Sequence, residues 1–159
     1  MAKTPRAPDQ PEEKVWSPEL IRSSLRKIRR RLAEVERFDP RKVTRQFDPQ
    51  VTVLEAQLRE TLSDVYGRNS QSYRIYQSAA SLDLAGINMN GTPLHRVIDG
   101  LVNGRARSIE LLRSALRMLE EKMGDDFPGE PLDQVALSGV AAIASAGGAT
   151  PSAGAGICR

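Results

Sequence analysis

The sequence predicts an all-α protein, an up-and-down bundle of about four helices, two of which are long. Apolar residues recur at steps of three and four positions, which aligns them along one side of a helix that must be buried against a neighbour. Aromatic residues make up only 4% of the chain, so the core must rest mainly on Leu, Ile, Val and Ala. Short connections favour antiparallel neighbours. The first long stripe consists of Ile21, Leu25, Ile28, Leu32 and Val35, and the second runs from Leu94 to Met123.

The first long helix is predicted to begin after Ser17 and to run to about Arg37. Three start signals coincide at Ser17-Pro18-Glu19, namely a capping hydroxyl, a proline at the first helical position and an acidic residue in the first turn. The segment Phe38-Asp39-Pro40 ends this helix, because a residue that precedes proline is disfavoured in the helical conformation.

A second and a third helix are predicted between residues 48 and 82. Asp48 can cap the second helix and Pro49 can open it, while Gly67 suits a left-handed C-cap. Asn69 and Ser70 are candidate caps of a shorter third helix. Tyrosines at helical spacing are more typical of a core than of a ligand pocket, so we expect core positions for Tyr66, Tyr73 and Tyr76.

The fourth helix is predicted to start at Thr92-Pro93, which repeats the cap-and-proline pattern, and to end before Gly124. Gly100 and Gly104 lie inside it, where each costs up to about 1 kcal/mol relative to alanine. Two explanations stay open. Close helix packing, within the bundle or across a dimer, would exploit the missing side chains, or the helix is kinked and splits near Asn103.

Composition divides the chain into three parts. Residues 1–16 are rich in proline and charge and read as a disordered lead, residues 17–124 form the bundle, and residues 125–159 end in an Ala/Gly-rich linker or tail. The single cysteine, Cys158, cannot form an internal disulfide, and no stretch approaches a secretory signal or a membrane span. We therefore expect a cytoplasmic protein that does not enter a membrane.

The formal net charge is only +3, but residues 20–31 contain six basic residues and no acidic one. On a helix, basic residues at this spacing share an exposed face that could meet phosphates or an acidic partner. Against nucleic-acid binding, no aromatic residue lies between these arginines to stack on bases, and charged runs are usually solvated faces. The candidate residues for an anionic partner are Arg22, Arg26, Arg29 and Arg30.

The polar residues form no pattern typical of catalysis. The only histidine is His95, and the sequence has neither an HExxH motif, nor paired cysteines, nor a glycine-rich loop between a strand and a helix. Acidic pairs such as Glu120 and Glu121 are adjacent and cannot converge on one substrate. We therefore predict no catalytic residue, no metal, no cofactor and no small-molecule substrate.

Several short segments resemble a known protein family. They are Phe47-Asp48-Pro49, Leu54-Glu55, Thr61 to Gly67, Tyr73 to Tyr76 and Ser81-Leu82-Asp83. Between about residues 18 and 123 the chain is similar to the helical N-terminal region of bacterial predicted nucleotide-binding proteins with a TIR-like domain. This resemblance implies a sensor, oligomeriser or adaptor associated with antiphage defence. The nucleotide chemistry would lie in the TIR-like domain, which nothing in this sequence matches, so no functional residue is carried over.

We expect a non-enzymatic helical module for protein association, with itself or with another protein. Helices one and four would supply the contact surface, because apolar residues beyond the buried stripes leave surface for a partner. The alternative is a nucleic-acid-binding module that acts through the basic face of helix one. The additional apolar residues are Val53, Leu84, Val102 and Leu111.

Overall fold

A computed structural model describes residues 14–86 and 91–132 of the chain. This part is helical and contains no strand, which confirms the predicted all-α class. In chain order its elements are α1 (Pro18–Arg37), the 3-10 turn η1 (Pro40–Lys42), α2 (Pro49–Tyr66), α3 (Gln71–Tyr76), the 3-10 turn η2 (Gln77–Ala80) and α4 (Leu94–Asp126).

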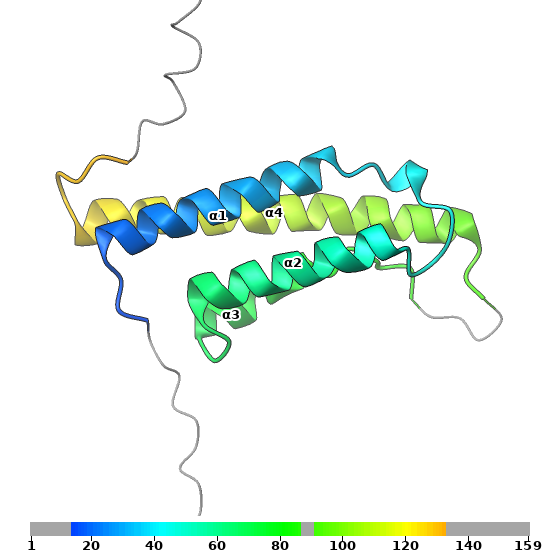
Figure 1. The fold of residues 1–159 in the computed structure, drawn as a ribbon, viewed down its shortest axis with the longest axis horizontal. Coiled ribbons are helices and arrows are strands. Elements are labelled where there is room, and N and C mark those ends of the chain that lie inside the picture. The colour runs from blue at the N-terminus through cyan, green and yellow to red at the C-terminus, as the bar shows by residue number, and fades with distance from the viewer. Residues whose placement is uncertain (1–13, 87–90, 133–159) are drawn as a thin grey trace, which may run out of the picture.

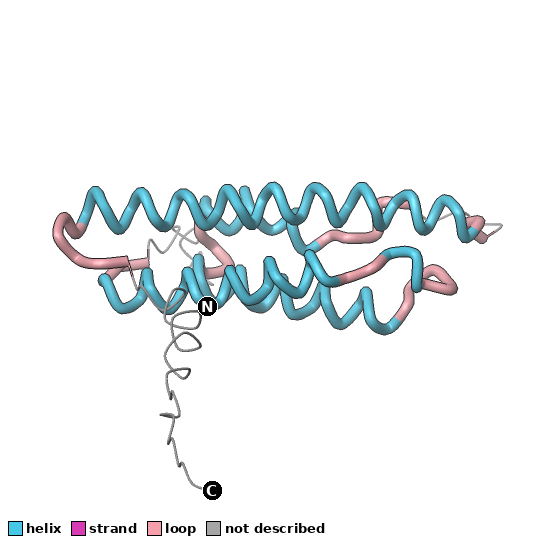
Figure 2. Tube along the Cα trace, turned by 90° about the horizontal axis from the view of Figure 1, so that it is seen from above, coloured by secondary structure: helices cyan, strands magenta, loops and turns pink. Residues whose placement is uncertain are grey.

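The helices run up and down along one common axis (Figure 1). Helix α1 packs along α4 in the opposite direction, and α2 returns along α1. The short α3 and η2 then pack against α2 and α4. Helix α4 has 33 residues, which corresponds to a length of about 50 Å. It therefore extends along the whole bundle (Figure 2).

Side-chain caps fix the starts of the first three helices as the sequence predicts. The Ser17 hydroxyl accepts a hydrogen bond from the Leu20 amide at 3.2 Å, and the Asp48 carboxylate accepts one from the Gln50 amide at 2.9 Å. For α3 the cap is Ser70. Each acceptor satisfies an amide that has no partner within its own helix. The sequence signals thus set the helix starts without tertiary help.

The sequence predicts the start of α4 to within one residue, but the predicted capping residue, Thr92, is wrong. Helix α4 begins at Leu94 without a side-chain cap, and Pro93 occupies the capping position instead of the first helical turn. The helix begins one residue later than the pattern predicts, so Thr92 lies before the capping position, and its hydroxyl donates a hydrogen bond to the Gly86 carbonyl oxygen at 3.2 Å. It closes the connection between η2 and α4 and does not bind the helix amides.

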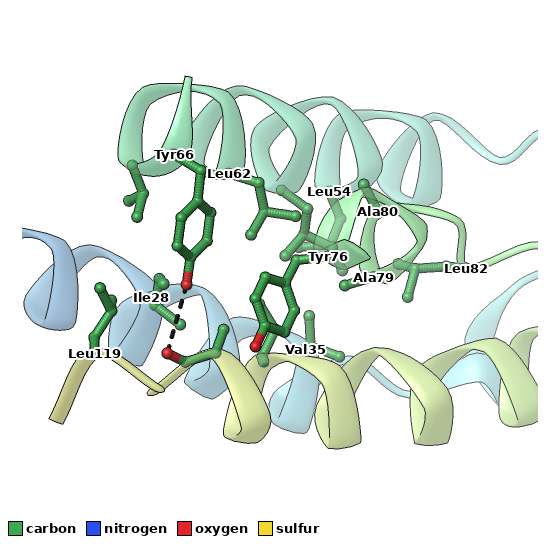
Figure 3. Close-up of a cluster of buried hydrophobic side chains, with 14 of the residues drawn as sticks. Ile28, Val35, Leu54, Leu62, Tyr66, Tyr76, Ala79, Ala80, Leu82 and Leu119 are labelled. Carbon is green, nitrogen blue, oxygen red and sulfur yellow. Dashed lines mark hydrogen bonds between the residues drawn. The ribbon is translucent and has the colours of Figure 1, made fainter. Parts of the chain in front are cut away.

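The core lies between α1, α2 and α4, and two tyrosines from α2 and α3 belong to it. Tyr66 and Tyr76 are buried with their rings stacked at a centroid distance of 5.4 Å. The Tyr66 hydroxyl donates to the Ala115 carbonyl oxygen of α4 at 3.5 Å (Figure 3). Core positions are therefore confirmed for these two residues, whereas Tyr73 is only partly buried.

Helix α4 is continuous through Asn103, so the predicted split at that residue is wrong. Gly100 and Gly104 are buried, and both face the nonhelical segment 81–86, which follows η2. A Cβ atom on Gly104 would lie 1.9 Å from the Leu82 carbonyl oxygen, and one on Gly100 would lie 2.5 Å from the Ala85 amide nitrogen. The predicted close approach is confirmed, but the backbone that approaches the two glycines belongs to the nonhelical segment 81–86, where we expected a second helix.

The packed region extends beyond the predicted boundaries of 17 and 124. Trp16 lies edge-on to Tyr66 at a centroid distance of 6.3 Å, and Lys14 donates hydrogen bonds to carbonyl oxygens at the end of α2. After α4, Phe127 packs against the core and Glu130 pairs with Arg22. The rest of the predicted lead and tail, residues 1–13 and 133–159, lies outside the described residues.

Candidate interaction surfaces

The four arginines that the sequence singles out lie on α1, and each of them has a partner in the chain. Arg22 pairs with Glu130 at 2.5 Å and Arg29 with Glu120 at 2.8 Å, while the highly exposed Arg30 pairs with Glu34 at 3.2 Å. Arg26 is exposed on the same helix. The charge of this face is thus largely balanced by acids of α1, of α4 and of the segment after α4.

An ion pair and hydrogen bonds from an arginine connect α1 to α2. Lys27 donates to the Asp64 carboxylate at 2.5 Å, and this hydrogen bond lowers the pKa of Asp64 despite an opposing contribution from burial. Burial alone would raise the pKa of Glu34, but hydrogen bonds from Arg31 and Arg30 hold it below its ordinary value. Arg31 also donates to Thr61 at 2.9 Å. These basic residues therefore hold helices together and line the groove between α1 and α2.

A different group of basic residues lies at the turn after α1, and we call it the basic corner. It consists of Arg37, Arg41, Lys42 and Arg45, all of which are exposed. Within residues 14–86 and 91–132, none of these four side chains takes part in an ion pair. The search for basic residues along one helix missed this group, because the four residues lie at the end of α1, within η1 and after it. The sequence signal that could have indicated the group is the presence of four basic residues within the nine positions 37–45.

The basic corner borders a hollow of about 360 Å³ between the end of α1, η1 and α4. Arg105 on α4 fixes this arrangement, because its Nε donates to the Val35 carbonyl oxygen at 3.0 Å and its Nη2 to the Glu36 carbonyl oxygen at 2.6 Å. A guanidinium group at the C-terminal carbonyls of a helix also stabilises the helix dipole. The lining residues are Glu36, Arg37, Phe38, Asp39, Pro40, Arg41, Val102 and Arg105.

The first half of α2 carries an uncharged outer surface, which we call the α2 face. It consists of Pro49, Gln50, Thr52, Val53, Ala56 and Gln57. Val53 keeps 55% of its surface exposed and lines a shallow hollow with Pro49, Gln50, Leu54 and Gln57. Among the other predicted apolar contact residues, Leu84 and Val102 are exposed and Leu111 is partly buried.

Phe47 has an unusual backbone conformation next to the α2 face. Its φ angle is 57°, a left-handed value that is rare for a bulky residue, and 64% of its surface is exposed. The segment around it is tied down on both sides, since Gln46 donates to the Gly86 carbonyl oxygen at 2.9 Å and Asp48 caps α2. Phe47 lines a groove with Val51, Thr52, Ser81 and Gly86, among others.

The described residues contain no group of three or more His, Cys, Asp or Glu side chains that could hold a metal ion. His95 is exposed near the start of α4. None of the helices in the described ranges combines the length and the apolar character that crossing a membrane requires. Comparison of the chain with protein families, with curated proteins and with solved structures found no match.

Proposed function

We propose that this chain is a non-enzymatic module that associates with a second copy of itself through the α2 face. The observation that carries this proposal is the contrast in charge between helix surfaces. The outward side chains of α1 are mainly basic, whereas the exposed side chains of the first half of α2 are neutral from Pro49 to Gln57. Two such faces can meet across a twofold axis without repulsion between like charges.

Packing on the inner side of α2 supports the same proposal. Helix α2 contacts α1, α3 and η2, and these neighbours leave the α2 face exposed except at Gln57, which is partly buried and accepts a hydrogen bond from Arg31 at 3.1 Å. The only acid between Pro49 and Gln57 is Glu55, whose carboxylate accepts hydrogen bonds from the amides of Leu82 and Asp83. Ala56 follows Val53 by three positions, so a small side chain lies where a partner helix would need room. A face of six residues is small compared with the roughly 20 to 30 residues per side of a stable interface, which favours a weak, concentration-dependent dimer.

The resemblance described above suggests a biological setting. In that setting the bundle would act in the bacterial cytoplasm as the sensor or adaptor part of a TIR-like defence protein, and its association would bring attached domains together. Nucleic-acid binding through α1 stays a prediction. No contact favours it, because Arg22, Arg29 and Arg30 already pair with acids of the fold.

Sedimentation velocity over a wide range of concentration tests the proposal. We expect the natural sequence to associate reversibly and the Val53→Glu variant to stay monomeric, because a carboxylate on each copy would be desolvated at the contact. The matched control is Ile75→Glu on α3, since Ile75 is 56% exposed and Val53 is 55% exposed. Both variants should melt like the natural protein. A natural chain that stays monomeric at every concentration, or equal effects of the two variants, would show that the proposal is wrong.

A further inference from the structure

We propose that the hollow at the basic corner binds an acidic peptide segment of another protein, with one apolar side chain of that segment on the floor of the hollow. This site goes beyond the self-association proposed above. It lies between α1, η1 and α4, and it shares no residue with the α2 face. Either proposal can therefore fail without the other.

The charge balance at this corner selects an anionic partner. Of the two acids that line the hollow, Glu36 pairs with Arg113 at 3.0 Å, and Asp39 caps η1 by accepting a hydrogen bond from the Arg41 amide at 3.1 Å. The side chains of Arg37 and Arg41, by contrast, have no acidic partner in the described part of the chain. Lys42 and Arg45 add to this excess of positive charge. A ligand carboxylate would thus meet cations that lose no existing ion pair on binding.

The shape and lining of the hollow favour a peptide over other polyanions. Phe38 and Val102 contribute apolar surface to the hollow, and Arg37 and Arg41, which carry guanidinium groups, line it as well. A phosphate backbone gains nothing from an apolar floor, and a flat lipid surface cannot enter a concave site. An acidic peptide with one apolar residue satisfies both parts, because guanidinium groups bind carboxylates in a bidentate manner while the apolar side chain leaves water.

The site is also formed before any ligand binds. The two hydrogen bonds from Arg105 to the end of α1 hold α1 and α4 together at the hollow. Pro40 is buried, and η1 is capped by Asp39. Little conformational entropy should therefore be lost from the protein on binding, which favours a measurable affinity for a short peptide.

Fluorescence anisotropy tests the proposal with a labelled peptide of Asp and Glu residues around one central Leu. A second probe has Ser in place of the Leu, and a third is a single-stranded DNA oligonucleotide of the same net charge. We expect the Leu peptide to bind most tightly and its affinity to fall as salt is raised. Tighter binding of the oligonucleotide, or no peptide binding at low salt, would overturn the proposal.

Substitutions test whether the Leu peptide binds at the basic corner. We expect Arg41→Glu to weaken binding of the Leu peptide about tenfold or more, because it replaces an attraction with a repulsion. The control is Arg59→Glu, which reverses an exposed basic residue on α2. Equal losses from Arg41→Glu and Arg59→Glu would contradict the proposal.

A second variant tests the apolar contact. Val102→Ser should reduce the advantage of the Leu peptide over the Ser peptide, while melting curves check that each variant is folded. An unchanged Leu preference in Val102→Ser would also contradict the proposal. Val53→Glu should bind the peptide normally, which separates this result from self-association.

Discussion

At the scale of single residues, Gly104 is a position where even one added methyl group would collide with the backbone of another segment. The added Cβ of a Gly104→Ala variant would lie within 3 Å of three backbone atoms of Leu82, which cannot move aside as a flexible side chain could. We expect this variant to lower the free energy of unfolding by about 3 kcal/mol or more, as overpacking of a rigid core does. Urea unfolding followed by circular dichroism measures the change.

The same helix offers a matched control for this variant. A Cβ on Gly124 would meet nothing within 4 Å, so Gly124→Ala should raise the free energy of unfolding by up to about 1 kcal/mol through helix propensity. If Gly104→Ala is as stable as the natural protein, the segment 81–86 does not lie against α4 as described.

Local signals on individual residues explain how much of the fold the sequence could predict. Ser17, Asp48 and Ser70 cap their helices through contacts within three residues, and such contacts can be read directly from the chain. Thr92 has the same pattern and does not cap, because α4 starts at Leu94 with Pro93 in the capping position, and the Thr92 hydroxyl instead donates to the Gly86 carbonyl oxygen. Gly100 and Gly104 predicted a close approach, but the identity of the neighbour depends on the path of segment 81–86, which has no periodic signal.

At the scale of helices, Tyr66 connects α2 to α4, and its burial makes this connection sensitive to alkaline pH. Burial in the core, with a smaller effect of Tyr76, raises the pKa of Tyr66 well above its model-peptide value of 10.0. The folded state therefore keeps the phenol proton at a pH where the unfolded chain releases it. The stability that this provides is complete below pH 10 and is lost as the pH rises above that value.

Replacing Tyr66 by Phe should remove this part of the alkaline loss. At neutral pH we expect Tyr66→Phe to cost no more than about 1 kcal/mol, because the hydrogen bond to Ala115 is long at 3.5 Å. Above pH 10 its stability should fall less steeply than that of the natural protein, as measured by urea unfolding at several pH values. The control Tyr73→Phe should keep the natural slope. A natural slope in Tyr66→Phe would mean that another group causes the alkaline loss.

The candidate surfaces were harder to predict than the helices, because they depend on how separate helices pack against one another. Helical spacing correctly indicated that Arg22, Arg26, Arg29 and Arg30 share α1, but it could not reveal that Glu120 and Glu130 would lie close enough to pair with two of them. These acids are 91 and 108 positions away along the chain. The basic corner, conversely, gains its importance from the absence of such partners, and this depends on how α1, η1 and α4 meet.

At the scale of the whole molecule, residues 14–16 join the start of the described chain to the end of α2. The ring of Trp16 packs edge-on against Tyr66, and Lys14 donates to the carbonyl oxygens of Asp64 and Val65. We expect Trp16→Ala to lower the free energy of unfolding by about 1 to 2 kcal/mol through lost burial and ring contact. Urea unfolding followed by circular dichroism measures this, since the variant lacks the only tryptophan.

The neighbouring residue provides the control for this prediction. Val15 is 89% exposed, so Val15→Ala should change the free energy of unfolding by less than about 0.5 kcal/mol. Equal stability of Trp16→Ala and the natural protein would show that the bundle begins at Ser17, as composition alone suggested.

The two ends of the described chain lie at the same end of the bundle, where α1 begins and the antiparallel α4 ends (Figure 1). This arrangement decides how the molecule responds to mechanical load. A force applied between these two ends acts perpendicular to the helix axes, so it would separate α1 from α4 sequentially, one helical turn after another. Contacts would break in sequence and not all at once in shear, and the bundle should therefore open under a small tension.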